Sequence, residues 1–223
     1  MNHHSDTRPS VDGEFSITAE NLSKRFNREW IFKDFNRRFA SPHWYALTGP
    51  NGSGKSTLLQ VLWGQLPPSS GVVVHKQGSA VLSQDDLTRH ISIAAPYMDL
   101  IGELTLMEHL RFHFQMKKIR NKMSLADLVD VLYLNEATEK YIHNFSSGMK
   151  QRLKLGLAMY TESNLVFLDE PGTNLDNQAF DWYCREIQKL RGKCLMIIAS
   201  NNPREYPGET EIIDLVRLKK NAV

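Results

Sequence analysis

A short glycine-rich segment has the residue types that are needed to hold a nucleotide phosphate. Residues 49–56 read Gly-Pro-Asn-Gly-Ser-Gly-Lys-Ser and match the pattern G-x-x-x-x-G-K-[ST]. Glycines let backbone N–H groups approach phosphate oxygens, the lysine places a cation on the outer phosphates, and the serine hydroxyl can bind Mg²⁺. A glycine-rich turn with an exposed lysine is the less favoured alternative. The candidate phosphate-binding residues are Gly49, Pro50, Asn51, Gly52, Ser53, Gly54, Lys55, Ser56 and Thr57.

Two carboxylates come directly after an apolar run. Asp169 and Glu170 follow residues 165–168, Leu-Val-Phe-Leu. A buried strand that ends in carboxylates places them at the carboxyl edge of the sheet, where a phosphate loop also lies. There Asp169 could hold Mg²⁺ together with Ser56, and Glu170 could orient an attacking water or accept its proton. Acids at a strand end are often only solvated, but the phosphate loop favours the functional interpretation.

The elements that position these residues follow from the apolar patterns. Residues 44–48 and 56–62 have the patterns of a strand before the loop and a helix after it. Residues 15–39 alternate between apolar and polar positions, which is typical of antiparallel strands. Continuous apolar runs at 80–82, 165–168 and 194–199 indicate parallel strands that are covered on both faces. Helical periodicity gives one apolar face to Leu125, Leu128, Val129 and Leu132, and another to Phe180, Tyr183, Ile187 and Leu190. The sequence therefore predicts an α/β fold, and residues 98–141, which contain no convincing strand, predict a helical lobe.

The composition is that of a soluble globular protein. The 223 residues include 27 Lys+Arg and 25 Asp+Glu, for a net charge of +2. This excess is too small for a broad basic surface, so we expect no nucleic-acid partner. No apolar run approaches the roughly 18 residues of a membrane span, and the polar N-terminus lacks the apolar core of a secretory signal. We therefore expect a cytoplasmic chain with a flexible polar tail at residues 1–13.

Two pairs of potential metal ligands have ordinary explanations. Cys184 and Cys194 form no Cys-x-x-Cys motif, and reduced structural thiols are the preferred interpretation. His109 and His113 are four residues apart on a predicted helix, which is the spacing of zinc ligands. Because no third ligand is evident, ordinary helix positions are favoured over a zinc site.

The order of the motifs is similar to that of a known family. Residues 145–152, Phe-Ser-Ser-Gly-Met-Lys-Gln-Arg, and residues 169–176, Asp-Glu-Pro-Gly-Thr-Asn-Leu-Asp, follow the phosphate loop. In this order they resemble the signature motif, the Walker B segment and the D-loop of the ATP-binding cassette (ABC) family, and the resemblance covers residues 15–218. It implies a P-loop NTPase fold with a RecA-like core, a parallel sheet, an N-terminal antiparallel β subdomain and an inserted helical lobe at about 97–160. A single ABC ATPase domain is expected at residues 14–219.

The resemblance also implies ligands and partners. ATP and Mg²⁺ would bind between this chain and a second cassette, in a homodimer or a heterodimer, arranged head to tail. Ser146, Ser147 and Gly148 would then contact the γ-phosphate held by the other cassette, and Asp176 would serve the contact between cassettes. Phe26 stands where the family usually has an aromatic residue that stacks on adenine. Transmembrane ABC subunits are expected partners, which would hold the chain at the cytoplasmic face of a membrane.

Several positions depart from the family pattern. Pro96 stands where a glutamine is usual, and Tyr97 is a possible substitute for it. Asn201 stands at the position of the switch histidine, where its amide can donate a neutral hydrogen bond but cannot become cationic. The signature has Ser147 and Met149 in place of glycine and glutamine. We expect ATP binding with slow or partner-dependent hydrolysis, in which the catalytic residues are Glu170, Lys55 and Asn201.

Three functions remain open at this stage. The favoured one is the ATPase subunit of a membrane transporter. The second is a soluble cassette ATPase without a transported substrate, and the third is a nucleotide-gated interaction module with little turnover. Neither the transported substrate nor its direction is indicated by the sequence.

Overall fold

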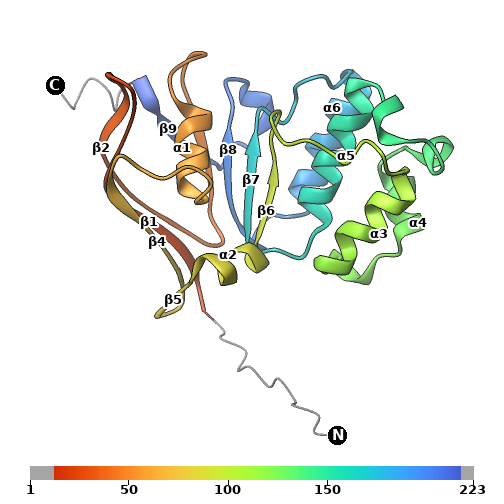
Figure 1. Ribbon diagram of the computed structural model, residues 1–223, viewed down its shortest axis with the longest axis horizontal. Coiled ribbons are helices and arrows are strands. Elements are labelled where there is room, and N and C mark those ends of the chain that lie inside the picture. Colours follow the sequence, from red (N-terminus) through yellow and green to blue (C-terminus); the bar gives the residue numbers. More distant parts are fainter. Residues whose placement is uncertain (1–12, 217–223) are drawn as a thin grey trace, which may run out of the picture.

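The computed structural model describes residues 13–216 and contains two sheets with helices around them (Figure 1). The first sheet is antiparallel, with the strand order β2-β1-β4-β5. The long strands β1 and β2 form a hairpin, in which Ser16 is paired with Ala40 and Phe26 with Glu29. The strands of this sheet are β1 (Phe15–Phe26), β2 (Glu29–Ala40), β4 (Ser70–Gln77) and β5 (Ala80–Val81).

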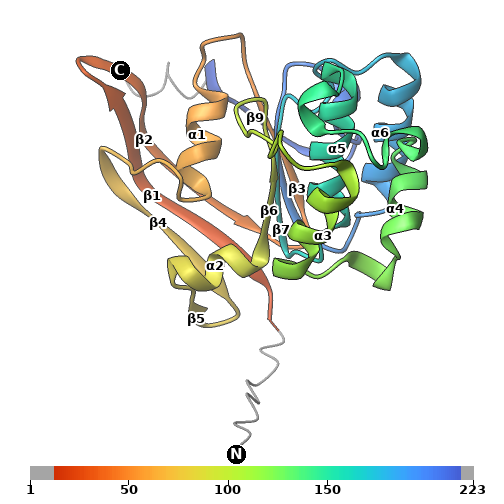
Figure 2. The same ribbon diagram turned by 45° about the vertical axis from the view of Figure 1, so that its right-hand side comes forward.

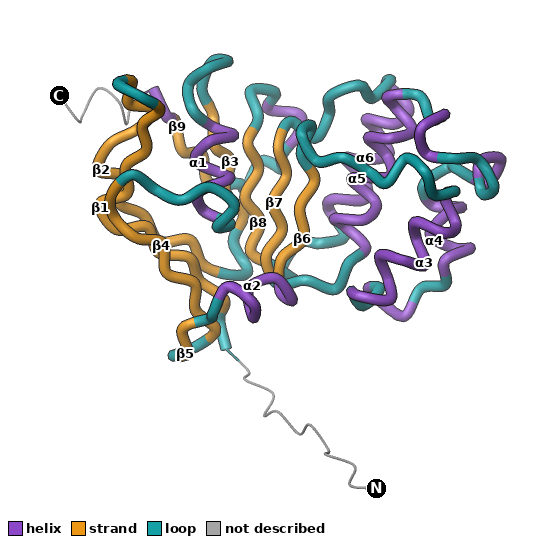
Figure 3. The backbone as a smooth tube through the Cα atoms, in the orientation of Figure 1, coloured by secondary structure: helices purple, strands orange, loops and turns teal. Residues whose placement is uncertain are grey.

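The second sheet is parallel, with the strand order β6-β7-β8-β3-β9. Its strands are β3 (Trp44–Thr48), β6 (Ile91–Ala94), β7 (Leu165–Asp169), β8 (Leu195–Ala199) and β9 (Glu211–Asp214). Because β3, β7 and β8 run in the same direction, the phosphate loop after β3 and the carboxylates at the end of β7 lie at one edge of the sheet. Figure 3 shows these strands side by side, with loops at both edges.

Helices cover both faces of the parallel sheet (Figures 1 and 2). Helix α1 (Lys55–Leu62) lies between the two sheets, and α5 (Ser147–Tyr160) and α6 (Asn177–Gln188) cover the opposite face. Helices α3 (Leu106–Met116) and α4 (Leu125–Val131) pack farther out, beside α5. The remaining helical segments are α2 (Gln84–His90), η1 (Arg120–Lys122), η2 (Asn135–Ala137), η3 (Ile142–Asn144) and η4 (Pro203–Glu205).

The core has two layers, one on each face of the parallel sheet. Along β7, Val166 and Leu168 pack toward the helical side, whereas Leu165 and Phe167 pack toward α1 and the antiparallel sheet. Successive side chains of a strand point to opposite faces, so a strand that is covered on both faces is apolar throughout. This burial accounts for the continuous apolar runs of β7 and β8.

Most of the expected elements are present. The predicted faces of α4 and α6 are turned inward, and residues 98–141 contain helices and no named strand. The interpretation of residues 80–82 as a buried parallel strand was wrong, because β5 is a two-residue antiparallel edge strand and Val81 is 66% exposed. Strand β9 was not predicted. Residues 1–12 of the expected tail and 217–219 of the expected domain lie outside the described residues. Between residues 13 and 216, no helix is long and apolar enough to cross a bilayer.

Candidate functional site

The phosphate loop joins β3 to α1 and ends at a glycine that no other residue could replace without strain. Gly54 precedes α1 with a φ of 103°, and a Cβ on it would lie 2.5 Å from Ile31 Cγ2. No side chain caps the N-terminus of α1. The first N–H groups of this helix and its positive dipole end are therefore directed at the loop, as anion binding requires.

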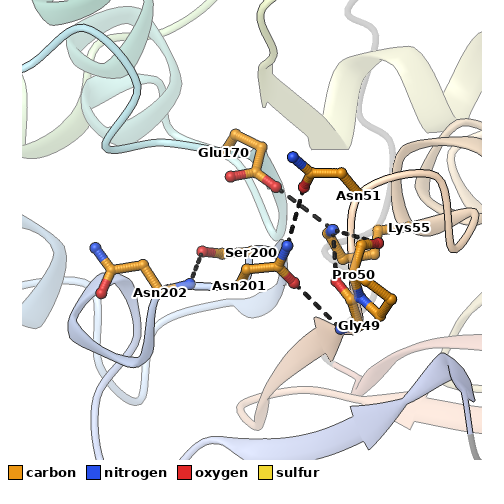
Figure 4. Close-up of polar contacts among 8 residues, drawn as sticks. All are labelled: Gly49, Pro50, Asn51, Lys55, Glu170, Ser200, Asn201 and Asn202. Atoms are coloured by element: carbon orange, nitrogen blue, oxygen red, sulfur yellow. Dashed lines mark hydrogen bonds and ion pairs between the residues drawn. The ribbon is translucent and has the colours of Figure 1, made fainter.

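Lys55 is held inside the loop. Its side chain is only 5% exposed, and its ammonium donates to the carbonyl oxygens of Gly49 at 2.8 Å and Pro50 at 3.4 Å. The same Nζ lies 3.6 Å from Oε1 of Glu170 (Figure 4). The loop thus brings together the cation and the carboxylate that were predicted from separate parts of the sequence. Phosphate oxygens could replace these carbonyl oxygens as acceptors, because a charged acceptor gives the ammonium a stronger hydrogen bond.

Asn201 links the end of β8 to the phosphate loop. Its Oδ1 accepts from the Gly49 N–H at 3.3 Å, and its Nδ2 donates to Oδ1 of Asn51 at 3.0 Å (Figure 4). The Asn201 amide therefore lies against the phosphate loop, and its role as a switch residue remains a prediction. Its donor is neutral and is engaged with another side chain.

Asp169 has the environment of a metal ligand. The residue is 1% exposed, and both carboxylate oxygens are buried without a well-formed hydrogen bond from the described residues. Burial raises the pKa of Asp169, while the nearby hydroxyls of Ser56 and Tyr97 and the Lys55 cation act in the opposite direction. A buried carboxylate without a partner, beside a serine hydroxyl, fits Mg²⁺, which prefers oxygen ligands.

The backbone of Glu170 is strained. Its φ is +46°, a left-handed conformation that costs a residue with a side chain about 1–2 kcal/mol. Its N–H donates to the Ala199 carbonyl at 2.8 Å, and its carbonyl accepts from Thr173 N–H at 3.0 Å. This tight turn at the end of β7 aims the Glu170 side chain at the phosphate loop while Asp169 stays buried.

A cavity of about 570 Å³ opens between the loop and these groups. Two of its wall residues, Ile31 from β2 and Thr173, were missed in the sequence. The alternation along β2 could have suggested Ile31. The residues that line the cavity are Ile31, Asn51, Gly52, Gly54, Lys55, Ser56, Thr57, Glu170 and Thr173.

Other predicted site residues lie outside this cavity. Phe26, at the end of β1, is 47% exposed, and the Lys24 Nζ lies 5.2 Å from its ring centre. Ser146 caps α5 by accepting from the Met149 N–H at 3.2 Å, next to Ser147 and Gly148. Asp176 caps α6 by accepting from the Ala179 N–H at 2.8 Å. Their proposed roles toward nucleotide and second cassette remain predictions.

In the segment after β6, Tyr97 is the residue that reaches Asp169. Its hydroxyl interacts with Gln60 and Asp169, and burial raises its pKa. Pro96 uses only its carbonyl, which accepts from Lys154 Nζ at 3.0 Å. This geometry favours Tyr97 over Pro96 as the residue that could take the role of the glutamine that is usual in the family.

The two histidines of α3 have structural surroundings. His113 Nε2 is 2.8 Å from the Thr161 hydroxyl, and His109 is 6% exposed. Across residues 13–216, no group of three His, Cys, Asp or Glu residues is arranged to hold a metal ion. His113 thus has a protein hydrogen-bond partner, whereas the buried Nδ1 of His109 has none among the described residues.

Comparison with known proteins agrees with the geometry. The family described as ABC transporter matches residues 32–173. The chain is 27% identical over 202 residues to the linearmycin resistance ATP-binding protein LnrL of Bacillus subtilis, covering 88% of this chain and 63% of that protein. It is 32% identical over 163 residues to the sulfate/thiosulfate import ATP-binding protein CysA of Thermosynechococcus vestitus, covering 72% and 48%. The chain thus spans about half to two thirds of these relatives.

The fold is also similar to a solved cassette. The structure titled as a dimeric, post-hydrolysis state of the ATP-binding cassette MJ0796 bound to ADP and Pi superposes with a TM-score of 0.74. The identity is 21%, and the match covers 89% of this chain and 93% of that one. At this identity the likeness concerns the fold alone, and the family assignment rests on the sequence match to residues 32–173. The phosphate loop, the buried Asp169 and the fold agree with that match, and the chain belongs to the ABC transporter family as an ABC ATPase nucleotide-binding domain.

Proposed function

We propose that this chain is the ATP-binding and ATP-hydrolysing subunit of a membrane ABC transporter. The observation that carries the proposal is the convergence of Lys55, Glu170 and Asn201 on one phosphate loop. A second cassette would close head to tail on the bound ATP and drive transmembrane partners. The relatives named for import and for resistance support a transport role, but they leave the cargo and its direction open.

Each side chain has a defined task in this proposal. Loop N–H groups and Lys55 bind the phosphates, and Glu170 orients the attacking water and takes its proton. Ser56 and Asp169 would hold Mg²⁺, which supplies positive charge to the phosphates when bound. Asn201 would exchange its bond with Asn51 for one to the γ-phosphate.

We expect turnover to be slow or to depend on a partner. Asn201 offers a neutral donor where a histidine could offer a cation, and charge-assisted hydrogen bonds are about twice as strong as neutral ones. The donor is also engaged with Asn51 in this structure. Closure by a second cassette or a membrane partner would supply the free energy that redirects it.

The test compares phosphate release by the purified chain and by its Glu170→Gln variant, with Glu209→Gln as a control on an exposed carboxylate (82% side-chain exposure). Glu170→Gln should lower turnover by about a hundredfold or more while nucleotide affinity is kept. Equal rates for the wild type and Glu170→Gln would remove the catalytic role of this carboxylate. Vigorous turnover by the isolated chain would contradict the slow or partner-dependent hydrolysis.

An apolar groove provides a place for the transmembrane partner. A cavity of about 360 Å³ lies between β6, α3 and α5. Met98, Ile101 and Phe112 line it and are 37%, 39% and 44% exposed. We propose that a cytoplasmic segment of the membrane partner packs here. Met98, which lines the groove, directly follows Tyr97, so a partner in this position would adjoin the segment that reaches Asp169.

A further inference from the structure

Another carboxylate, Glu205, is buried near the edge of the sheet where Glu170 and Asn201 lie, and it has no part in the proposed chemistry. It is 5% exposed and ends η4, immediately after the loop that carries Asn201. Its backbone carbonyl accepts from the Tyr183 hydroxyl on α6 at 2.6 Å. The main chain of Glu205 is therefore anchored to α6, and its side chain is free to serve another segment.

That segment is the turn after Glu170. The Glu205 carboxylate interacts with the side chains of Ser200 and Asn202 and with the backbone N–H of Gly172, and each of these contacts favours its charged form. The approach is close, because a Cβ added to Gly172 would lie 2.4 Å from Glu205 Oε1. One carboxylate thus joins the turn after β7 to the loop after β8.

The turn is tied from the other side as well. Nε2 of Gln151, a buried residue near the start of α5, donates to the Pro171 carbonyl at 2.8 Å. Gln151 and Glu205 therefore hold successive residues, Pro171 and Gly172. A left-handed residue such as Glu170 persists only where its surroundings over-determine its conformation, and these two contacts hold the residues that follow it.

The burial of Glu205 indicates a role other than simple solvation. Its Oε2 has no partner among the described residues. Burial is the main cause that raises the pKa of Glu205, and the Glu170 charge acts in the same direction. Burying an acid with one unpaired oxygen is unfavourable for stability, and the contacts that its carboxylate makes with the two loops offer a reason for its place there.

We propose that Glu205 is a positioning residue that holds the turn after Glu170 and the loop of Asn201 as one unit. This inference rests on the proposed roles of Glu170 and Asn201 in hydrolysis. Glu205 itself touches neither nucleotide nor water. Its loss would let the strained backbone of Glu170 relax and move the carboxylate away from the attacking water.

The first test measures amide hydrogen exchange in the full chain and does not depend on turnover. Glu205→Ala should increase exchange at residues 170–174, because the tie to Gly172 is lost. The phosphate loop at 49–57 should stay unchanged, because the Glu205 carboxylate contacts Gly172, Ser200 and Asn202 and no residue of that loop. Gly172→Ala should act in the same way by forcing the two segments apart. Unchanged exchange at 170–174 in both folded variants would overturn the proposal.

The second test uses steady-state hydrolysis. Glu205→Ala should lower kcat about tenfold or more and change the KM for ATP less than about twofold. Glu205→Gln keeps an acceptor for the Gly172 N–H and should recover part of kcat. Glu209→Gln, on an exposed carboxylate four residues away, should have no effect.

A double variant separates the two proposals. If Glu205 acts through Glu170, adding Glu205→Ala to Glu170→Gln should cause little further loss, because coupled residues are not additive. A full additional loss would contradict the positioning role. Wild-type turnover by Glu170→Gln would instead refute the role of Glu170, and the exchange measurement would then decide the role of Glu205 alone.

Discussion

At the scale of single residues, the candidate site consists of polar side chains that lie around the phosphate loop and differ in how well they are paired. Lys55 rests on carbonyl oxygens of its own loop, Asn201 on Asn51, and Asp169 has no well-formed partner. In the proposed function, Lys55 and Asp169 would bind a phosphate and a metal ion without a large rearrangement. Asn201 would first have to release Asn51, so its part of the site is not preorganised.

The clearest consequence concerns Asp169. Asp169→Asn removes a buried charge and keeps the side-chain shape, so it should increase the free energy of unfolding of the nucleotide-free chain by about 1–2 kcal/mol. ATP with Mg²⁺ should stabilise the wild type more than ATP with a chelator does, and Asp169→Asn should remove this difference. Thermal unfolding without nucleotide, with ATP and Mg²⁺, and with ATP and a chelator measures both effects.

The exposed Asp181 offers a matched control for this change. Asp181→Asn should alter the free energy of unfolding by less than about 0.5 kcal/mol and keep the Mg²⁺ effect, since that side chain is 63% exposed. An Asp169→Asn variant that still gains the full stabilisation from Mg²⁺ would exclude this residue as a metal ligand.

At the scale of elements, the sequence was informative wherever the relevant contacts are local. The loop at 49–56 and the run before Asp169 carry their chemistry within a few residues, so the strand, turn and helix could be predicted from pattern alone. Strand β9 has only two apolar residues, and Ile212 is 60% exposed, so an edge strand leaves little apolar signal. Glu205 could not be predicted because the contact that gives it a proposed role, with Gly172, joins residues that are more than thirty positions apart in sequence.

Ser146, at the N-terminus of α5, caps the helix and also has a proposed role in binding ATP. The two roles can be separated by experiment. Ser146→Ala removes a cap and should cost about 1 kcal/mol of stability. Ser124→Ala, at the start of α4, removes a similar cap, in which Oγ accepts from Asp127 N–H at 3.0 Å. In a Glu170→Gln background, sedimentation should show weaker ATP-dependent dimerisation only for Ser146→Ala. If both variants weaken ATP-dependent dimerisation equally, Ser146 acts only as a helix cap.

The packing of α3 against α5 predicts a dependence of stability on pH. Burial lowers the pKa of His113 from 6.5 to about 4, and the charges of His109 and Lys117 act in the same direction. Lys154 and Asp99 also line this region. Between these two pKa values the unfolded chain binds more protons than the folded one, so stability falls as the pH is lowered from 6.5 toward 4.

A variant identifies the histidine that is responsible. His113→Gln keeps a polar group near the Thr161 hydroxyl and cannot titrate. Urea unfolding at pH 8 and pH 5 should show a smaller loss of stability for the variant than for the wild type, by about 1–2 kcal/mol. The same loss in both proteins would assign the pH dependence to other groups.

At the scale of the whole molecule, α5 connects three regions to which we have assigned proposed functions. It begins at the signature residues, Gln151 ties it to the turn after Glu170, and Lys154 Nζ donates to the Ala95 and Pro96 carbonyls at 3.3 and 3.0 Å. The segment that follows Pro96 enters the apolar groove and carries Tyr97, which interacts with Asp169. A partner in the groove and a nucleotide at the loop would therefore act on the same rigid helix, which is a physical route for coupling between them.

This arrangement predicts that a substitution in the groove can weaken binding of the partner while ATP binding is kept. Phe112→Ser should reduce co-purification of a multi-span membrane protein from detergent-solubilised host membranes, because it removes exposed apolar surface at the groove. ATP affinity should stay within about twofold of the wild type, and Val81→Ser, on the distant strand β5, should change neither property. Photo-crosslinking from position 101 identifies what lies in the groove. A crosslink to a soluble protein, or none to a membrane protein, would favour a cassette that works without transport.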